Sequence, residues 1–366
     1  MKIKELLNLM IKKGASDLYF KVGSPPCLRI DGRLTPLEEK KLTPQDTERI
    51  AQEIMSESQG QDFHKKKEMD LAYEISDLGR FRVNIFYQRN SVGIVLREVR
   101  RKIPSFEELN LPAEVLRKLS LETRGLVLIT GVAGSGKSTT LAAMIDYINE
   151  NKKGHIITIE DPIEFVHQDK KSIISQREVG LDTHSFNEAL RHVIRQSPDV
   201  ILIGEMRDQE TMETAIMAAE TGHLVLSTLH TVNAAQAVER IVNYFPPYLH
   251  GQIRMQLSLI LKGVISLRLL PRAKGEGRIP AVEVLVSTPT IKKLILEGKT
   301  TQIPAAMEAG ELFGMQTFNQ ALIKLHTKKL VNYETMLSAA DSPDELKLSI
   351  EGIYSGQKSI KAEEGT

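Results

Sequence analysis

The sequence contains no tryptophan, and aromatic residues make up only 5% of it. Aromatic side chains are the usual stacking platforms of proteins that bind single-stranded nucleic acid. The 48 Lys and Arg residues against 47 Asp and Glu leave a formal net charge of +1, so the strongly basic balance of many nucleic-acid binders is also missing. A local basic groove could exist, but both observations argue against a nucleic-acid partner.

Cysteine is nearly absent as well. The single Cys27 excludes an intramolecular disulfide framework and suits a reducing compartment. No apolar run approaches the roughly 18–20 residues of a membrane span, and the longest candidate, 257–270, is interrupted by Lys262 and Arg268. The N-terminal segment lacks a long apolar stretch and predicts a short amphipathic helix rather than a signal peptide. We therefore expect a cytoplasmic protein that meets a membrane only through partners.

The 366 residues exceed one average domain, so we expect at least two. Residues 1–100 read as a small α+β unit, with strands expected at 70–75, 80–88 and 91–99. A connector is expected at 101–122, which contains two prolines.

The pattern changes in the second part of the chain. Short apolar runs alternate with segments at helical spacing, which predicts βαβ units and a mostly parallel sheet over 123–355. After residue 246 the chain is expected to be largely helical. The tail at 356–366 is small and polar, and we expect it to be disordered.

A phosphate-binding motif begins this second part. The apolar run 125–130 leads into GVAGSGKS at 131–138 and then into a predicted helix, the strand–loop–helix context of a P-loop. Glycines let backbone N–H groups turn inward, and the helix N-terminus adds the positive end of its dipole. A lysine reaches the phosphates and a serine hydroxyl ligates Mg²⁺. The predicted nucleotide-binding residues are Gly131, Gly134, Ser135, Gly136, Lys137, Ser138 and Thr139.

The motif alone does not reveal the use of the nucleotide. No guanine-reading N-K-x-D segment follows it, which argues against a GTPase and favours ATP with Mg²⁺.

Carboxylates follow two of the later predicted strands. Glu160, Asp161 and Glu164 come at the end of one apolar run, where ligands bind in open α/β sheets. Hydrolysis needs a carboxylate to orient the attacking water and acidic groups to hold Mg²⁺. The alternative is a solvated acidic loop. The run 200–203 leads to Glu205, an arrangement with the shape of a Walker B strand. The predicted metal-binding residues are Ser138, Glu160 and Glu205.

Two histidines flank the next apolar run. His223 opens it and His230 closes it, and their odd separation places them on opposite faces of an ideal strand. His230, at the C-terminal end, is the better candidate for a phosphate sensor. His223 can equally be a structural core residue.

Taken together, GVAGSGKST, TIEDPIEFVH, DVILIGEMRD and AAETGHLVLSTLHT occur in the order found in the secretion ATPases of type II and type IV secretion and of type IV pili. Nearly the whole chain resembles this superfamily, and within it the PilT/PilU family of pilus retraction ATPases.

The resemblance implies a hexameric ring of chains, each with a PAS-like N-terminal domain joined to a RecA-like ATPase domain. It implies that ATP sits between the domains, that Glu164 is the catalytic base, and that Glu205 is the Walker B acid. Two arginines of the N-terminal domain, at positions matching Arg82 and Arg97, would close on the phosphates. From the residues alone, Arg82 alternates with Phe81 and Val83 and is expected to face away from the apolar side.

The resemblance also implies a function. The chain is expected to power pilus retraction and twitching motility by acting on a platform protein of the inner membrane, where it would be peripheral. The alternatives are a pilus assembly or type II secretion ATPase and, less favoured, a nucleic-acid translocase. Assembly ATPases often carry a four-cysteine metal module, which one cysteine cannot form. One departure stands out: where the family has A-I-R-N-L-I-R-E, residues 290–297 read TIKKLILE, without either arginine.

Overall fold

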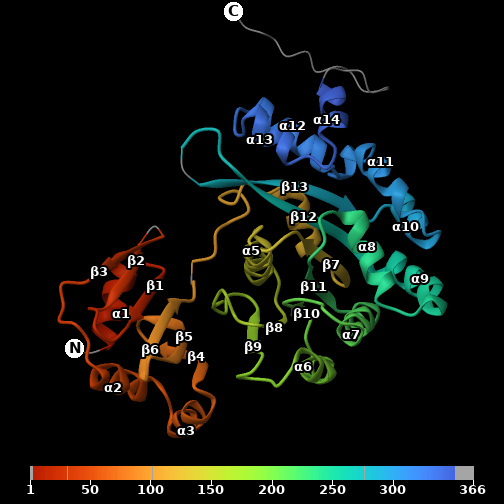
Figure 1. Ribbon diagram of the computed structural model, residues 1–366. Helices are drawn as coiled ribbons and strands as arrows, with labels where there is room; N and C mark the ends of the chain where they lie inside the picture. The colour runs from red at the N-terminus through yellow and green to blue at the C-terminus, as the bar shows by residue number, and fades with distance from the viewer. Residues whose placement is uncertain (1–2, 31, 101, 276, 351–366) are drawn as a thin grey trace, which may run out of the picture. The chain divides into compact units, whose positions relative to one another are not determined.

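A computed structural model describes residues 3–30, 32–100, 102–275 and 277–350 (Figure 1). The expected tail at 356–366 lies outside these residues. The chain divides into two compact units: the first comprises 1–102 with 164–166, and the second comprises 103–163 with 167–366.

The first unit is an antiparallel sheet with helices. Its strand order is β3-β2-β1-β6-β5-β4, and one face packs on an apolar core that includes Leu18, Phe81 and Leu96. The predicted strands at 70–75, 80–88 and 91–99 are present as β4, β5 and β6, whereas β1–β3 are too short and too mixed in pattern to stand out in the sequence. The elements are α1 (Ile3–Lys12), β1 (Asp17–Phe20), β2 (Cys27–Ile30), β3 (Arg33–Pro36), α2 (Pro44–Ile54), α3 (Glu57–Lys66), β4 (Glu68–Ile75), β5 (Gly79–Gln88) and β6 (Ser91–Glu98).

The second unit is built on a sheet of order β13-β12-β7-β11-β10-β8-β9, in which every pair except β12–β13 is parallel. Its strands are β7 (Gly125–Thr130), β8 (His155–Glu160), β9 (Ile173–Glu178), β10 (Val200–Ile203), β11 (Leu224–Leu229), β12 (Leu261–Pro271) and β13 (Arg278–Val286). Its helices are α4 (Ala113–Ser120), α5 (Lys137–Asn151), α6 (Phe186–Val193), α7 (Gln209–Glu220), α8 (Ala234–Asn243), α9 (His250–Ile260), α10 (Pro289–Leu296), α11 (Ile303–Glu308), α12 (Phe318–Thr327), α13 (Tyr333–Ser338) and α14 (Pro343–Ile350).

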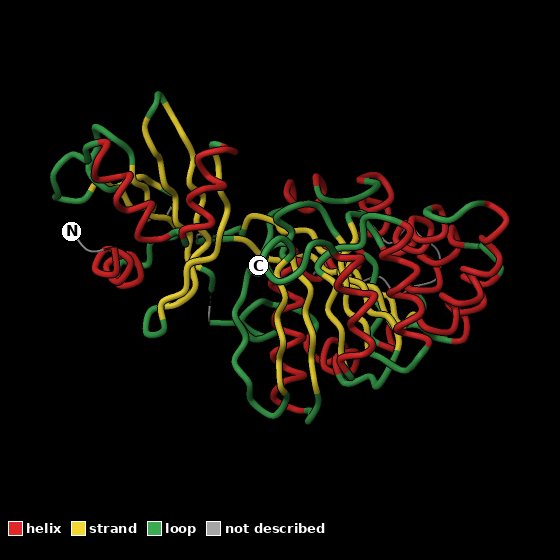
Figure 2. Tube along the Cα trace, turned by 90° about the horizontal axis from the view of Figure 1, so that it is seen from below, coloured by secondary structure: helices red, strands yellow, loops and turns green. Residues whose placement is uncertain are grey.

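Helices cover both faces of this sheet (Figures 1 and 2). Along β7, Leu126 and Leu128 point into a core shared with α6–α11, whereas Val127 and Ile129 point into a second core shared with α4 and α5. This alternation explains why the central strands read as continuous apolar runs in the sequence, since both of their faces are buried.

After residue 246 the chain is largely helical, as expected, except for two strands that the sequence reasoning missed. Residues 261–271 and 278–286 form β12 and β13, which extend the sheet beyond β7. The apolar stretch 257–270 is split between the end of α9 and β12. No helix among the described residues is long and apolar enough to cross a membrane.

Of the connector expected at 101–122, residues 103–122 pack into the second unit. Phe106, Val115, Leu116 and Leu119 are buried in the core on the α5 side of the sheet. The division between the units therefore falls at residues 102 and 103.

Candidate nucleotide site

The predicted site motifs follow four neighbouring parallel strands. In the order β7-β11-β10-β8, the P-loop follows β7, His230 follows β11, Glu205 lies two residues beyond β10, and Glu160 ends β8. Because the carboxyl ends of parallel strands meet at one edge of a sheet, these segments lie side by side, as the α/β topology predicts for a ligand site.

The P-loop conformation depends on its glycines. Gly131 has φ 141°, and a Cβ there would lie 2.5 Å from Ser135 Oγ and 2.6 Å from the carbonyl oxygen of Leu267. Gly136, with φ 99°, is the N-cap of α5 and contributes no side-chain cap. The first N–H groups of α5 therefore have no side-chain cap from this position, which suits an anion at the helix N-terminus.

Lys137 is 9% exposed and folds back over the loop. Its Nζ donates to the carbonyl oxygens of Gly131, at 2.8 Å, and Val132, at 3.1 Å. The Ser135 hydroxyl is buried and has no hydrogen-bond partner among the residues that the structure describes. The ammonium group of Lys137 and the buried hydroxyl of Ser135 thus both belong to the P-loop segment.

The Glu205 carboxylate contacts two side chains at the site. Its Oε1 lies 3.1 Å from His230 Nε2, and its Oε2 lies 2.8 Å from Arg207. The structure therefore brings together the predicted Walker B acid and the predicted sensor histidine. His223 lies at the opposite end of β11, where its Nδ1 is 2.9 Å from the Ala218 carbonyl oxygen.

Glu160 is fixed by neutral donors. Thr158 Oγ1 donates to its Oε1 at 2.6 Å, and Gln176 Nε2 donates to the same oxygen at 3.1 Å. Gln176 Oε1 in turn accepts from the backbone N–H of His167 at 2.8 Å. Burial lowers the pKa of His167 to about 4, so its imidazole is neutral near pH 7.

The Glu164 side chain is exposed. The segment Glu164–Val166 belongs to the first unit, because it pairs with the end of that unit. Phe165 forms a parallel bridge with Arg100, and the Val166 N–H donates to the Arg100 carbonyl at 3.0 Å. Arg82 and Arg97 also lie in the first unit, directly opposite each other on β5 and β6. Arg82 is exposed beside the buried Phe81 and Val83, as the alternation predicted.

Sequence reasoning missed the hydroxyls that join the strand ends. Ser227 Oγ donates to the Ile203 carbonyl at 2.8 Å, and Thr228 Oγ1 donates to the Gly204 carbonyl at 2.7 Å. They fix the segment that carries Glu205 against the segment that carries His230. Two adjacent hydroxyls inside an otherwise apolar strand are the signal that could have identified them, since buried polar groups need partners.

A second missed residue is Glu283 on β13, which is 6% exposed. Its Oε2 accepts from the Ala234 N–H at the start of α8 at 2.7 Å. Glu283 also lies directly opposite Ser266 on the neighbouring strand β12. Ser266 Oγ accepts from Thr130, the last residue before the P-loop, at 2.9 Å. Burial raises the pKa of Glu283 to about 7, although its hydrogen bonds with the Ala234 backbone and the Ser266 side chain lower that pKa.

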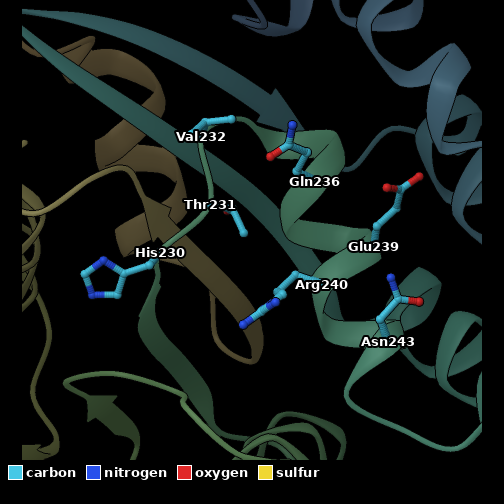
Figure 3. A pocket seen from close by; sticks show the side chains of 7 residues that line it. All are labelled: His230, Thr231, Val232, Gln236, Glu239, Arg240 and Asn243. Atoms are coloured by element: carbon cyan, nitrogen blue, oxygen red, sulfur yellow. The ribbon is translucent and has the colours of Figure 1, made fainter.

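A polar pocket of about 340 Å³ adjoins His230. Figure 3 shows side chains from α8 and from the segment after β11 around it; its lining residues are His230, Thr231, Val232, Gln236, Glu239, Arg240 and Asn243.

The donor set suits Mg²⁺, which prefers oxygen ligands and keeps several waters when it binds with nucleotide phosphates. Ser138 and the acids Glu160 and Glu205 supply hydroxyl and carboxylate oxygens at one sheet edge. Across the described residues, no group of three or more His, Cys, Asp or Glu could hold a metal ion without the nucleotide.

Comparison with known proteins gives the relatives of this chain. The family described as type II/IV secretion system protein matches residues 1–278. The chain is 49% identical to the type IV pilus ATPase PilU of Pseudomonas aeruginosa over 350 residues, 96% of this chain and 91% of that protein. It is 46% identical to the type IV pilus retraction ATPase PilT of the same organism over 349 residues, 94% of this chain and 99% of that protein.

Comparison with solved structures gives relatives of the same kind. A crystal structure of the pilus retraction motor PilT with bound ADP has a TM-score of 0.88 at 48% identity, covering 95% of this chain and 99% of that one. The ATPase DotB of Legionella pneumophila has a TM-score of 0.74 at 26% identity, covering 96% of this chain and 95% of that one. The predicted α/β fold, with a RecA-like second unit and an α+β first unit, is thereby confirmed.

Proposed function

Because the chain belongs to the type II/IV secretion system protein family, we propose that it is an ATPase that powers the retraction of type IV pili. The observation that carries the proposal is similarity over nearly the full length to PilT and PilU, in a chain whose P-loop, Glu205 and His230 follow adjacent strands. Twitching motility is the expected cellular output.

The second unit supplies the phosphate cradle. The P-loop amides and Lys137 bind the β- and γ-phosphates, and Ser138, Glu160 and Glu205 hold Mg²⁺ and its waters. When bound, Mg²⁺ neutralises charge on the phosphate oxygens. In this proposal His230, which contacts Glu205, reports the state of the γ-phosphate to α8 through the segment that follows it.

Glu164 orients and deprotonates the attacking water in this proposal. The first unit carries Glu164 together with Arg82 and Arg97. Guanidinium groups stay charged and grip phosphate oxygens at two points, so Arg82 and Arg97 are suited to contact the nucleotide. Movement of the first unit would then be coupled to hydrolysis.

The motor is proposed to act as a homo-hexameric ring in the cytoplasm. Its partner would be the pilus platform protein at the inner membrane, which would account for peripheral association with that membrane. The near-zero net charge and the lack of tryptophan support a protein partner over nucleic acid.

We expect Glu164→Gln to bind ATP normally but to lose turnover, because the water-activating group is removed while the phosphate cradle stays intact. The measurement is ATP binding and steady-state hydrolysis by the full chain, with the exposed Glu188→Gln as control. Normal hydrolysis by Glu164→Gln would move the base to another carboxylate, Glu205 first.

Deleting the gene in its host tests whether the protein powers pilus retraction. Cells should keep surface pili and lose twitching, and the wild-type gene, but not the Glu164→Gln gene, should restore it. A deletion strain without pili would identify an assembly ATPase, and a piliated strain that still twitches would contradict a retraction function.

A further inference from the structure

Charged side chains form a row across the sheet of the first unit. Arg29 on β2 lies directly opposite Asp17 on β1, and Asp17 lies opposite Arg97 on β6. Arg97 lies opposite Arg82 on β5. Directly opposite residues of antiparallel strands project from the same face. Three arginines and one carboxylate therefore lie side by side on one face, and we call this set the arginine row.

The other face of the same strands is the core. The residues next to the row, including Leu18, Leu28, Val83 and Leu96, are at most 1% exposed. The row therefore lies on the outward face, where arginines are ordinarily well separated and solvated. Here Arg82 and Arg97 are direct neighbours, although like charges directly opposite each other destabilise a sheet. An anion bound at the row would offset this repulsion, in addition to the carboxylate of Asp17.

Asp17 is the only acid in the row, and it is 1% exposed. Its Oδ1 accepts from Arg97 Nε at 2.7 Å. Its Oδ2 accepts from Ser16 Oγ at 2.7 Å and lies 3.5 Å from Arg29 Nε. Ser16 and Arg29 thus contact one oxygen of the Asp17 carboxylate, while its other oxygen accepts from Arg97 Nε.

The grip on Nε sets the orientation of the guanidinium. The Arg97 side chain stays 62% exposed although its Nε is bound, so its two terminal nitrogens are the part left to solvent. A planar guanidinium anchored at Nε presents these nitrogens as a fork, the geometry that grips two oxygens of one phosphate. With one carboxylate against three arginines, the row keeps an excess of positive charge.

We propose that Asp17 is a positioning residue that orients Arg97, beside Arg82, for the phosphates of the nucleotide. The inference rests on the proposed contact between Arg97 and phosphate, and it adds that the contact is organised before the nucleotide arrives. Fixing a long side chain in advance removes part of the ordering cost of binding.

The test compares two carboxylates of the same sheet in the full chain. Asp17→Asn keeps the shape of the side chain and removes the charge that holds Arg97. Asp70→Asn is the matched control, because Asp70 on β4 accepts from Asn84 on β5 at 3.0 Å and makes no contact with Arg97. We expect Asp17→Asn to lower kcat/KM for ATP hydrolysis about tenfold and Asp70→Asn to leave it unchanged.

The double variant separates positioning from folding. If Asp17 acts through Arg97, Asp17→Asn combined with Arg97→Ala should be no slower than Arg97→Ala alone, since the two changes remove one interaction. Fully multiplicative losses, or a lower melting temperature for Asp17→Asn with kcat and KM unchanged, would overturn the inference.

Two results separate this inference from the proposed function. Full ATPase activity of Arg97→Ala would show that Arg97 is not needed for hydrolysis. A slow Arg97→Ala variant together with a fully active Asp17→Asn variant would overturn only the role of Asp17. If Asp17→Asn does not fold, Arg97→Lys serves instead: lysine keeps the charge but cannot be anchored at Nε while presenting a fork. Activity restored by lysine would overturn the proposal.

Discussion

At the scale of single residues, the site depends on a carboxylate with one partner nearby in the sequence and one partner from the neighbouring strand. Glu205 is held between Arg207, two positions away, and His230, which follows the neighbouring strand. Its charge is balanced while its position at the strand end is fixed by the hydroxyls of Ser227 and Thr228. A change at any of these residues should therefore act on geometry as well as on charge.

Lys137→Ala should abolish most ATP hydrolysis while the fold persists. The lysine belongs to no apolar core of the described residues, and two of its hydrogen bonds go to carbonyls of the loop itself. Removing a charged donor from the transferred phosphate should cost ~10²-fold or more in kcat. The measurements are ATPase rate and melting temperature, with Lys118→Ala on the surface of α4 as control. A variant that retains most of the wild-type rate would refute the P-loop assignment.

Glu283→Gln should change how stability depends on pH. The pKa of Glu283 is about 7 in the folded protein, above the ordinary value of 4.5, because burial disfavours its charge. Between these pH values the folded state binds more protons than the unfolded state, so this group makes stability fall as pH rises from 4.5 to 7. The upper limit of the loss is about 3 kcal/mol.

Glutamine keeps an acceptor for the Ala234 N–H and does not titrate. We therefore expect Glu283→Gln to be more stable than the wild type at pH 8, with the difference shrinking toward pH 5. Thermal unfolding at both pH values checks this, with Glu188→Gln as control. If the stabilities of Glu283→Gln and the wild type changed with pH in the same way, Glu283 would not be the source of the pH dependence. The nearby Arg268 and Asp341 would then be the next candidates.

At the scale of elements, the sequence predicted best the strands that are buried on both faces. β7, β8, β10 and β11 are continuous apolar runs, and the motifs that follow them could be placed at one sheet edge from topology alone. β9 was not predicted because this edge strand is mostly polar and only partly buried. β12 was missed because its apolar run continues directly from α9.

The same limit applies to the site. The P-loop, Glu205 and His230 could be found from local patterns, since each motif is contiguous in the sequence. The roles of Ser227, Thr228 and Glu283 depend on pairings between strands, which a single sequence does not reveal. Arg82, Arg97 and Glu164 remain predictions for catalysis.

Helix α10 provides a prediction about motor output. Lys292 and Leu296 lie one turn apart on its exposed face, where the family motif has arginines, and Leu296 is 51% exposed. Leu296→Asp should leave the ATPase rate unchanged and shift stability by no more than about 0.5 kcal/mol, as for other surface positions. We expect it to stop twitching, because α10 occupies the position of the family motif and packs mainly against α9 and α11.

The measurements are ATPase activity of the purified variant and twitching of a host that carries it. Leu34→Asp on β3, where the leucine is 57% exposed, is the matched control. Normal twitching with Leu296→Asp would show that this face of α10 does not transmit force.

At the scale of the whole molecule, the chain passes between its two units more than once. After the division at residues 102 and 103, it returns to the first unit for Glu164–Val166 and then re-enters the second. The segment that carries the proposed base is thus attached to the strand end at Arg100, which directly follows the arginine-bearing sheet. The proposed base and the two proposed phosphate-binding arginines therefore belong to the first unit, whereas the P-loop belongs to the second.

A protein that begins at residue 103 should separate these contributions. It keeps both cores of the second unit and the P-loop, so we expect it to fold and to bind ATP. It loses Arg82, Arg97 and the Arg100 partner of Phe165, and the loss of phosphate-binding arginines can cost ~10³-fold in rate. Circular dichroism, nucleotide binding and hydrolysis are measured beside the full chain, with oligomeric state from light scattering. Wild-type hydrolysis by a monomer of residues 103–366 would show that the second unit is catalytically complete, and neither the arginine row nor a ring would then be needed for turnover.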